Sequence, residues 1–171
     1  AGDLYDILFM PVTLPYNETA EGGLGIHSKF SHNDEEASAG YYRVKLQDYD
    51  INVELTATPR CGVQRYTFPK AESMVILNLK KAMNWDFTMD SNIEVVDSCN
   101  IRGYRFSEGW ARGQKVYFAT RFSRPFKSVE LDEEAIELKG EKVGTSKVAR
   151  FMFDTEEGEQ ITVVTALSGV S

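Results

Sequence analysis

The segment FSHNDEEASAGYY, residues 30–42, gathers an imidazole and several carboxyl groups within a few positions. The side chains of His32, Asp34 and Glu35 are of types that bind metal ions or act as an acid and base pair, and they also occur in polar loops. Ser31 suits a local cap in which its hydroxyl accepts the backbone N–H of Asp34. From these residues alone, a metal site, an acid–base pair and a polar loop all remain open.

Other catalytic motifs are missing from the sequence. A Ser or Cys nucleophile needs a His base, yet the chain has only His27 and His32 and no Gly-x-Ser-x-Gly elbow. Neither glycine pattern of phosphate-binding loops occurs, and no Asp-x-Asp-x-Asp-Gly order suggests an EF-hand. Two cysteines and two histidines fall short of the four closely paired ligands of a typical zinc site. These observations argue against a nucleophilic hydrolase, a nucleotide-binding protein and a zinc protein.

Paired carboxylates can hydrolyse a glycosidic bond, one as the acid and the other as the base or nucleophile. The chain holds 26 Asp and Glu residues, so pairs arise readily and are weak support for catalysis. We predict that the acidic runs at 34–36, 131–137 and 154–159 are solvated turns.

Two tryptophans lie in polar surroundings that contain or adjoin glycine, Trp85 in AMNWDF and Trp110 in SEGWARGQ. The flat face of an indole ring can stack on the C–H face of a sugar while its edge stays in water. Each tryptophan is therefore a candidate sugar platform, and the alternative is a rim residue that covers the end of the core. Tyr41 and Tyr42 are predicted to pack at the start of their strand.

The elements that position these residues read almost entirely as strands. In INVELTAT, Ile51, Val53 and Leu55 fall on one face and polar residues on the other, the period of a half-buried strand. Similar segments lie at 6–11, 41–46, 62–68, 73–79, 92–97, 100–106, 115–122, 126–131, 147–153 and 160–167. Their short connections suit hairpins, so we predict an all-β, antiparallel β-sandwich with helical turns only in 31–39 and 79–86.

The length, composition and charge of the chain exclude further classes of protein. The 171 residues fit one domain, and an apolar share of 42% supports a packed core. A net charge of −7 without a basic stripe predicts no nucleic-acid partner, and no apolar run or leader pattern predicts a membrane span or signal peptide. Cys61 and Cys99 could form one disulfide in an oxidising compartment or remain free as small buried residues; their spacing does not decide, and free thiols are favoured. The chain is expected to be a domain excised from a longer protein.

The amino-acid sequence of several segments resembles that of the N-terminal domain of glycoside hydrolase family 92, the calcium-dependent exo-acting α-mannosidases. The first two blocks are FSHNDEEASAGYYRVKL and INVELTATPRCGVQRYTFP. They are joined by GDLYDILFMP, GWARGQKVYFATRFSRPF and VVTALSGVS, in an order that covers nearly the whole chain.

This resemblance implies a β-sandwich, part of a galactose-mutarotase-like supersandwich, followed by an (α/α)6 domain with most of the catalytic and calcium-binding residues. The full-length enzyme would hydrolyse α-mannosidic linkages of glycans, α-1,2 linkages above all, with inversion. This chain would then carry no catalytic residue and no cofactor, with calcium bound in the parent enzyme. By the same resemblance, His32, Asp34 and Glu35 belong to a sandwich loop, as packing or interdomain residues rather than a metal site.

Two functions are therefore expected from this sequence. The first is the non-catalytic N-terminal domain of an exo-α-mannosidase, which supplies stability and one wall of a cleft shared with the helical domain. Its partners would be that domain and mannose-containing glycans, in the periplasm or at the cell surface. The alternative is an independent carbohydrate-binding module that uses Trp85 or Trp110. His32, Asp34, Glu35 and the two tryptophans are the substrate-facing or interdomain candidates.

Overall fold

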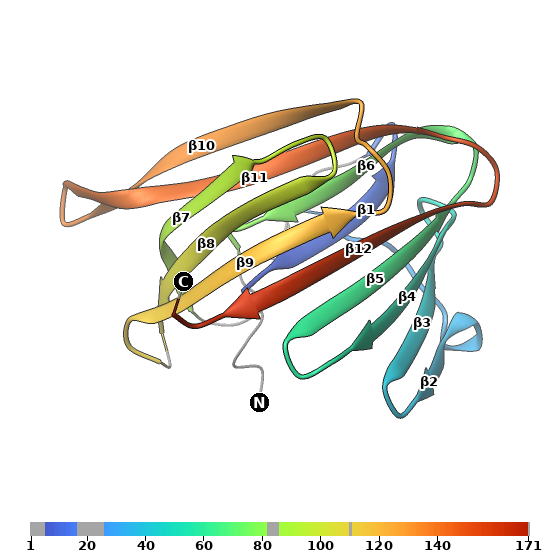
Figure 1. Ribbon diagram of the computed structural model, residues 1–171, viewed down its shortest axis with the longest axis horizontal. Helices are drawn as coiled ribbons and strands as arrows, with labels where there is room; N and C mark the ends of the chain where they lie inside the picture. Colours follow the sequence, from blue (N-terminus) through green and yellow to red (C-terminus); the bar gives the residue numbers. More distant parts are fainter. Residues whose placement is uncertain (1–5, 17–25, 82–85, 110, 171) are drawn as a thin grey trace.

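The structure, a computed structural model, is described here for residues 6–16, 26–81, 86–109 and 111–170. Two antiparallel sheets lie face to face, as Figure 1 shows. The all-β sandwich predicted from the sequence is confirmed. Within the described part of the chain, no helix has the length and hydropathy needed to cross a membrane.

The smaller sheet has four strands and the larger has eight, and every pairing is antiparallel. The smaller sheet runs in the order β1 (Leu8–Thr13), β6 (Ala71–Asn78), β11 (Glu141–Thr155) and β10 (Ser128–Leu138). The larger runs β2 (Glu36–Ser38), β3 (Tyr41–Leu46), β4 (Ile51–Ala57), β5 (Cys61–Phe68), β12 (Glu159–Ser168), β9 (Gln114–Phe122), β8 (Asn100–Glu108) and β7 (Phe87–Val95). One 3-10 turn, η1, spans His32–Asp34.

The core lies between the inner faces of the sheets, where the period-two alternation places apolar side chains. Phe122 of the larger sheet packs against Phe151 of the smaller one with ring centroids 4.9 Å apart, and Phe126 lies 5.1 Å from Phe151. All three rings are buried. Aromatic pairs at these distances add packing energy beyond their buried area, so they help to hold the two sheets together.

The two sheets approach each other closely where β11 crosses β7. The backbone N–H of Thr145 donates to Asp90 Oδ1 at 2.9 Å, and that of Lys147 donates to Ser91 Oγ at 2.9 Å. A Cβ atom at Gly144 would lie 2.1 Å from the carbonyl oxygen of Met89, so the crossing requires a glycine. These contacts close one side of the sandwich.

The predicted strands all occur, but some details were wrong. The acidic run 131–137 lies in β10, whose side chains are mostly exposed, and not in a turn. Strand β2 was not predicted, because its three residues are all exposed and too few to establish a period. The helical turn expected in 31–39 is confirmed as η1, whereas most of the turn expected in 79–86 lies outside the described residues. Cys61 and Cys99 are free thiols, as predicted.

Candidate functional site

The loop that contains η1 is organised by local hydrogen bonds. The Ser31 hydroxyl accepts the backbone N–H of Asn33 at 3.2 Å, while the N–H of Asp34 donates to the Ser31 carbonyl oxygen at 2.9 Å. The predicted cap therefore exists, but it is the neighbouring amide that binds the hydroxyl. This arrangement fixes the turn that precedes Glu35.

Glu35 is the most constrained carboxylate of this loop. The Tyr42 hydroxyl donates to Glu35 Oε1, and the His32 ring lies against Oε2. These contacts, with Tyr42 first, hold the pKa of Glu35 below its usual value, and Glu35 in turn raises the pKa of Tyr42 to about 12. A carboxyl group with a lowered pKa is ionised at neutral pH and is poorly suited to donate a proton.

The remaining side chains of the loop do not converge on one point. Asp34 Oδ2 accepts from Gln47 Nε2 at 3.1 Å, away from the Glu35 contacts, and the His32 side chain is 89% exposed. Among the residues that the structure describes, no group of three or more His, Cys, Asp or Glu side chains is placed to hold a metal ion. The hydrogen bonds of His32, Asp34 and Glu35 are those of a polar loop.

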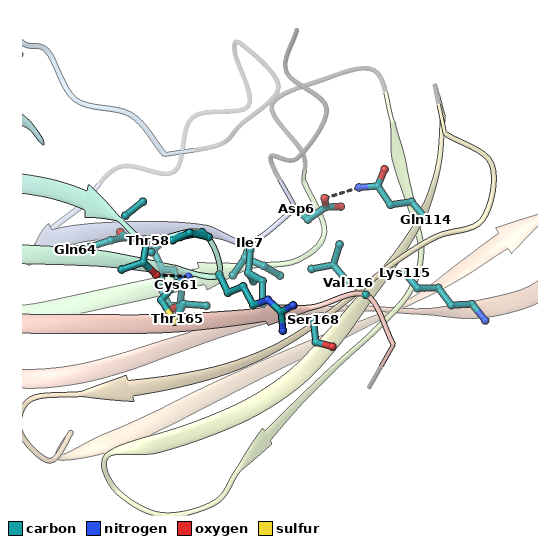
Figure 2. Close-up of a pocket in the computed structure, with 17 residues that line it drawn as sticks. Asp6, Ile7, Thr58, Cys61, Gln64, Gln114, Lys115, Val116, Thr165 and Ser168 are labelled. Carbon is teal, nitrogen blue, oxygen red and sulfur yellow. Dashed lines mark hydrogen bonds between the residues drawn. The ribbon is translucent and has the colours of Figure 1, made fainter. Parts of the chain in front are cut away.

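A pocket of about 600 Å³ opens at one end of the sandwich. Figure 2 shows side chains from distant segments meeting there, with Asp6 and Gln114 joined by a hydrogen bond. The lining comes from the start of β1, the β4–β5 turn, the start of β9 and the end of β12; it includes Asp6, Ile7, Thr58, Arg60, Gln114 and Ser168. We call this cavity the end pocket.

Behind this pocket lies Arg105 of β8, whose side chain is completely buried. Its Nη1 donates to Asp6 Oδ1 and, at 3.1 Å, to Asp86 Oδ2. Its Nε donates to the Leu79 carbonyl oxygen at 3.2 Å and to Thr88 Oγ1 at 2.9 Å. One guanidinium thus ties the start of β1 to β7, β8 and the segment that follows β6.

Two polar atoms of this cluster have no hydrogen-bond partner among the described residues, namely Arg105 Nη2 and Asp86 Oδ1. The backbone also packs tightly here, because a Cβ atom at Gly109 would lie 2.5 Å from Asp86 Cβ. The backbone at position 109 can therefore approach Asp86 only because the residue there is glycine. Gly109 thus allows the close packing that holds Asp86 beside Arg105.

Asp6 is the one carboxyl group among the described residues that line the end pocket. Burial raises the pKa of Asp6, and the charge of Arg105 opposes that shift. Both of its oxygens are engaged, Oδ1 by Arg105 and Oδ2 by Gln114 Nε2 at 2.5 Å. Glycoside hydrolysis needs two carboxyl groups about 5–9.5 Å apart across the sugar, and Asp6 lacks such a partner in this lining. The arrangement favours a structural role.

Sequence reasoning did not single out this cluster. The signal was present, since the alternation of β8 places Arg105 on the same face as Ile101, a buried core residue. A charged residue at an inward position predicts a buried ion pair, although not the identity of its partners. The other two candidates from the sequence, Trp85 and Trp110, lie outside the described residues.

Fold and site together define an antiparallel β-sandwich domain braced by a buried arginine and open at one end. The chain belongs to glycosyl hydrolase family 92, because the model of the family's N-terminal domain matches residues 1–168. The resemblance inferred from the sequence blocks is thereby confirmed. A comparison with curated proteins found no match.

Solved structures of family members are similar to this chain. The family GH92 α-mannosidase BT3965 from Bacteroides thetaiotaomicron, solved alone and with mannoimidazole, is 28% identical over 97% of this chain, with TM-scores of 0.84 and 0.83. The inverting mannosidase BT2199 from the same organism is 23% identical over 96% of this chain, with a TM-score of 0.73, and supports the fold alone. The chain spans 24% of the length of BT3965 and 22% of that of BT2199.

Proposed function

We propose that this chain is the N-terminal β-sandwich domain of an exo-acting α-mannosidase, and that it contributes stability and one wall of the cleft rather than catalytic groups. The family match over residues 1–168, together with the 28% identity to an α-mannosidase four times longer, is the observation that carries the proposal. The full-length enzyme is proposed to hydrolyse α-mannosidic linkages of glycans, α-1,2 linkages above all, with inversion and with calcium bound.

The geometry of the two best-defined carboxyl groups favours a structural role for this chain over a catalytic one. Its carboxyl group in the end pocket, Asp6, is hydrogen-bonded through both oxygens to Arg105 and Gln114, and no second carboxyl group lies in the described lining. Glu35, the best-defined carboxylate of the η1 loop, is held ionised by Tyr42 and His32. Neither is arranged as the acid of an acid–base pair.

We place the catalytic acid, the base and the calcium ligands in the helical domain that the family resemblance implies. That domain is the proposed partner of this chain, and mannose-containing glycans are the proposed substrate. His32, Asp34 and Glu35 are proposed as packing or interdomain residues. The periplasm or the cell surface is the proposed location, on the family resemblance alone.

Mannose release tests the proposal. The 171-residue chain is incubated with α-1,2-mannobiose and calcium, beside a longer protein in which the same chain is followed by its natural downstream sequence. We expect no release above background from the chain alone and calcium-dependent release from the longer protein. Turnover by the chain alone that is lost in Glu35→Gln or Asp6→Asn would contradict the proposal.

A further inference from the structure

A second hollow, of about 530 Å³, lies on the outer face of the larger sheet, over β7, β8, β9 and β12. In Figure 1 these strands run side by side in the order β7, β8, β9, β12. Its floor is formed by two small residues, Ala119 and Ala166, which are exposed and face each other across β9 and β12. We call this hollow the outer trough.

One wall of the outer trough is aromatic. The register places Tyr104 opposite Tyr117, and their ring centroids lie 6.1 Å apart. Phe106 stacks on one face of Tyr104 with centroids 4.4 Å apart. Tyr104 and Arg102 are neighbours on the same face of β8, and both line the hollow, so the aromatic wall adjoins the arginine.

The end of the outer trough is ionic but electrically balanced. Arg102 lies opposite Ala119 in the register, and it binds Glu94 with two hydrogen bonds of 2.8 Å, from Nε to Oε2 and from Nη2 to Oε1. The Arg102 and Glu94 side chains are 64% and 50% exposed, so both can still reach a ligand. Asn92 and Ser168 add polar groups beside the two tyrosines.

These groups match the two kinds of surface on a pyranose ring. An aromatic face stacks on the apolar C–H face of a sugar, and a planar carboxylate–guanidinium pair can bind neighbouring hydroxyls through its outer donors and acceptors. Because the charges of Glu94 and Arg102 compensate each other, the trough favours a neutral ligand over an anionic one. The volume falls within the range of about 300–1,000 Å³ typical of small-molecule sites.

We infer that the outer trough binds a neutral glycan, with one pyranose unit stacked on Tyr104 above Ala119 and Ala166 and hydrogen-bonded to Arg102 and Glu94. This site adjoins the end pocket, with which it shares Leu167 and Ser168, but its aromatic wall and its Glu94–Arg102 pair lie outside that pocket. It requires no catalytic residue and no second domain, so it goes beyond the proposed function of the chain and can fail independently of it.

The test is a titration of the 171-residue chain with α-1,2-mannobiose, maltotriose and cellotriose, followed by amide NMR shifts. Trigalacturonic acid serves as the anionic comparison. We expect a saturable response to at least one neutral sugar, with a dissociation constant on the order of 1 mM for so small a ligand. The shifts should centre on residues 102–104, 117–119 and 166, which line the outer trough and not the end pocket, and the anionic sugar should bind at least about threefold more weakly.

A variant that fills the floor of the outer trough distinguishes binding at this site from non-specific binding elsewhere on the surface. Ala119→Gln adds a side chain at an exposed strand position and should abolish saturation, while the matched variant Asn52→Gln, at an exposed position of β4 on the same face, should leave it unchanged. Tyr104→Ala should weaken binding by about three- to tenfold, and Tyr104→Phe should retain it. If Ala119→Gln does not fold, Ala166→Gln fills the same floor.

The inference is overturned if none of the neutral sugars gives a saturable response. It is equally overturned if the floor-filling variant binds as well as the unmodified chain, or if the shifts centre on the end pocket. In each of these cases the outer face would serve another purpose, such as contact with a second protein domain, and the proposed function would be untouched.

Discussion

Replacing Arg105 with methionine should destabilise the domain strongly, because the arginine is the only cation in contact with the buried Asp6 among the described residues. The substitution keeps an unbranched side chain of similar reach but removes four hydrogen bonds, two to carboxylates, one to the Leu79 carbonyl and one to Thr88. It leaves an uncompensated charge beneath the end pocket.

The size of the effect follows from the burial of the pair. The Arg105 and Asp6 side chains are 0% and 4% exposed, and breaking a buried pair by removing one partner costs about 3–5 kcal/mol. For a domain of this length, each kcal/mol lowers Tm by about 2–4 °C, so we expect Tm to fall by about 6–20 °C. That is a large part of a typical stability of about 5–15 kcal/mol.

The same strand provides the matched control. Arg102 also binds a carboxylate, Glu94, with two hydrogen bonds, but both side chains are at least half exposed. An exposed pair contributes about 0–1 kcal/mol, so Arg102→Met should change Tm by less than about 4 °C. Thermal unfolding followed by circular dichroism measures both variants. Equal changes in Tm would refute the reasoning from burial.

The pH dependence gives a second check on the same variant. Burial already raises the pKa of Asp6 in the folded protein, and removing the opposing charge of Arg105 raises it further. A carboxyl group whose folded pKa exceeds its unfolded pKa stabilises the fold below the unfolded value, and this stability is lost as pH rises through the folded value. The stability gap between Arg105→Met and the unmodified chain should therefore narrow from pH 7 toward pH 4. A gap that widens would contradict the assignment.

Three further outcomes are expected. The hydrogen bond to Glu35 raises the pKa of Tyr42 to about 12, so the stability that this bond contributes should be present below about pH 10 and lost toward pH 12. Urea unfolding at pH 9 and pH 11 should show this loss for the unmodified chain and not for Tyr42→Phe. Gly109→Ala places a Cβ 2.5 Å from its nearest neighbour and should cost about 1–3 kcal/mol by urea unfolding, whereas Gly169→Ala, with open space, should cost almost nothing. Phe151→Ala, in the buried core, should cost about 3–5 kcal/mol in the same assay, and a loss below 1 kcal/mol would mean that the sheets are not held by this ring.

The half-buried strands could be predicted from the sequence because each has one polar, solvent-exposed face and one apolar face. INVELTAT is clear for this reason, and it forms β4 at Ile51–Ala57. The method fails where a strand is exposed on both sides, as in β10, whose run of acids mimics a turn. The three residues of β2 are all exposed and too few to establish a period, so this strand was not predicted either.

The candidate sites were predicted less well than the fold, for a physical reason. Asp6 and Arg105 are 99 residues apart in sequence, so their ion pair depends on the topology of both sheets rather than on a local pattern. The outer trough similarly depends on register, which places Ala119 opposite Ala166 across 47 positions. By contrast, the cap at Ser31 depends on neighbours and was predictable to within one amide.

The most direct measurement of the central claim is complementation in trans. The helical domain proposed to follow this chain in the full-length enzyme, produced without residues 1–171, is assayed for calcium-dependent mannose release before and after addition of this chain. We predict little or no activity from either part alone and restored turnover when they are mixed. Full activity of the helical domain without this chain would contradict the claim that the β-sandwich supplies stability and a wall of the cleft.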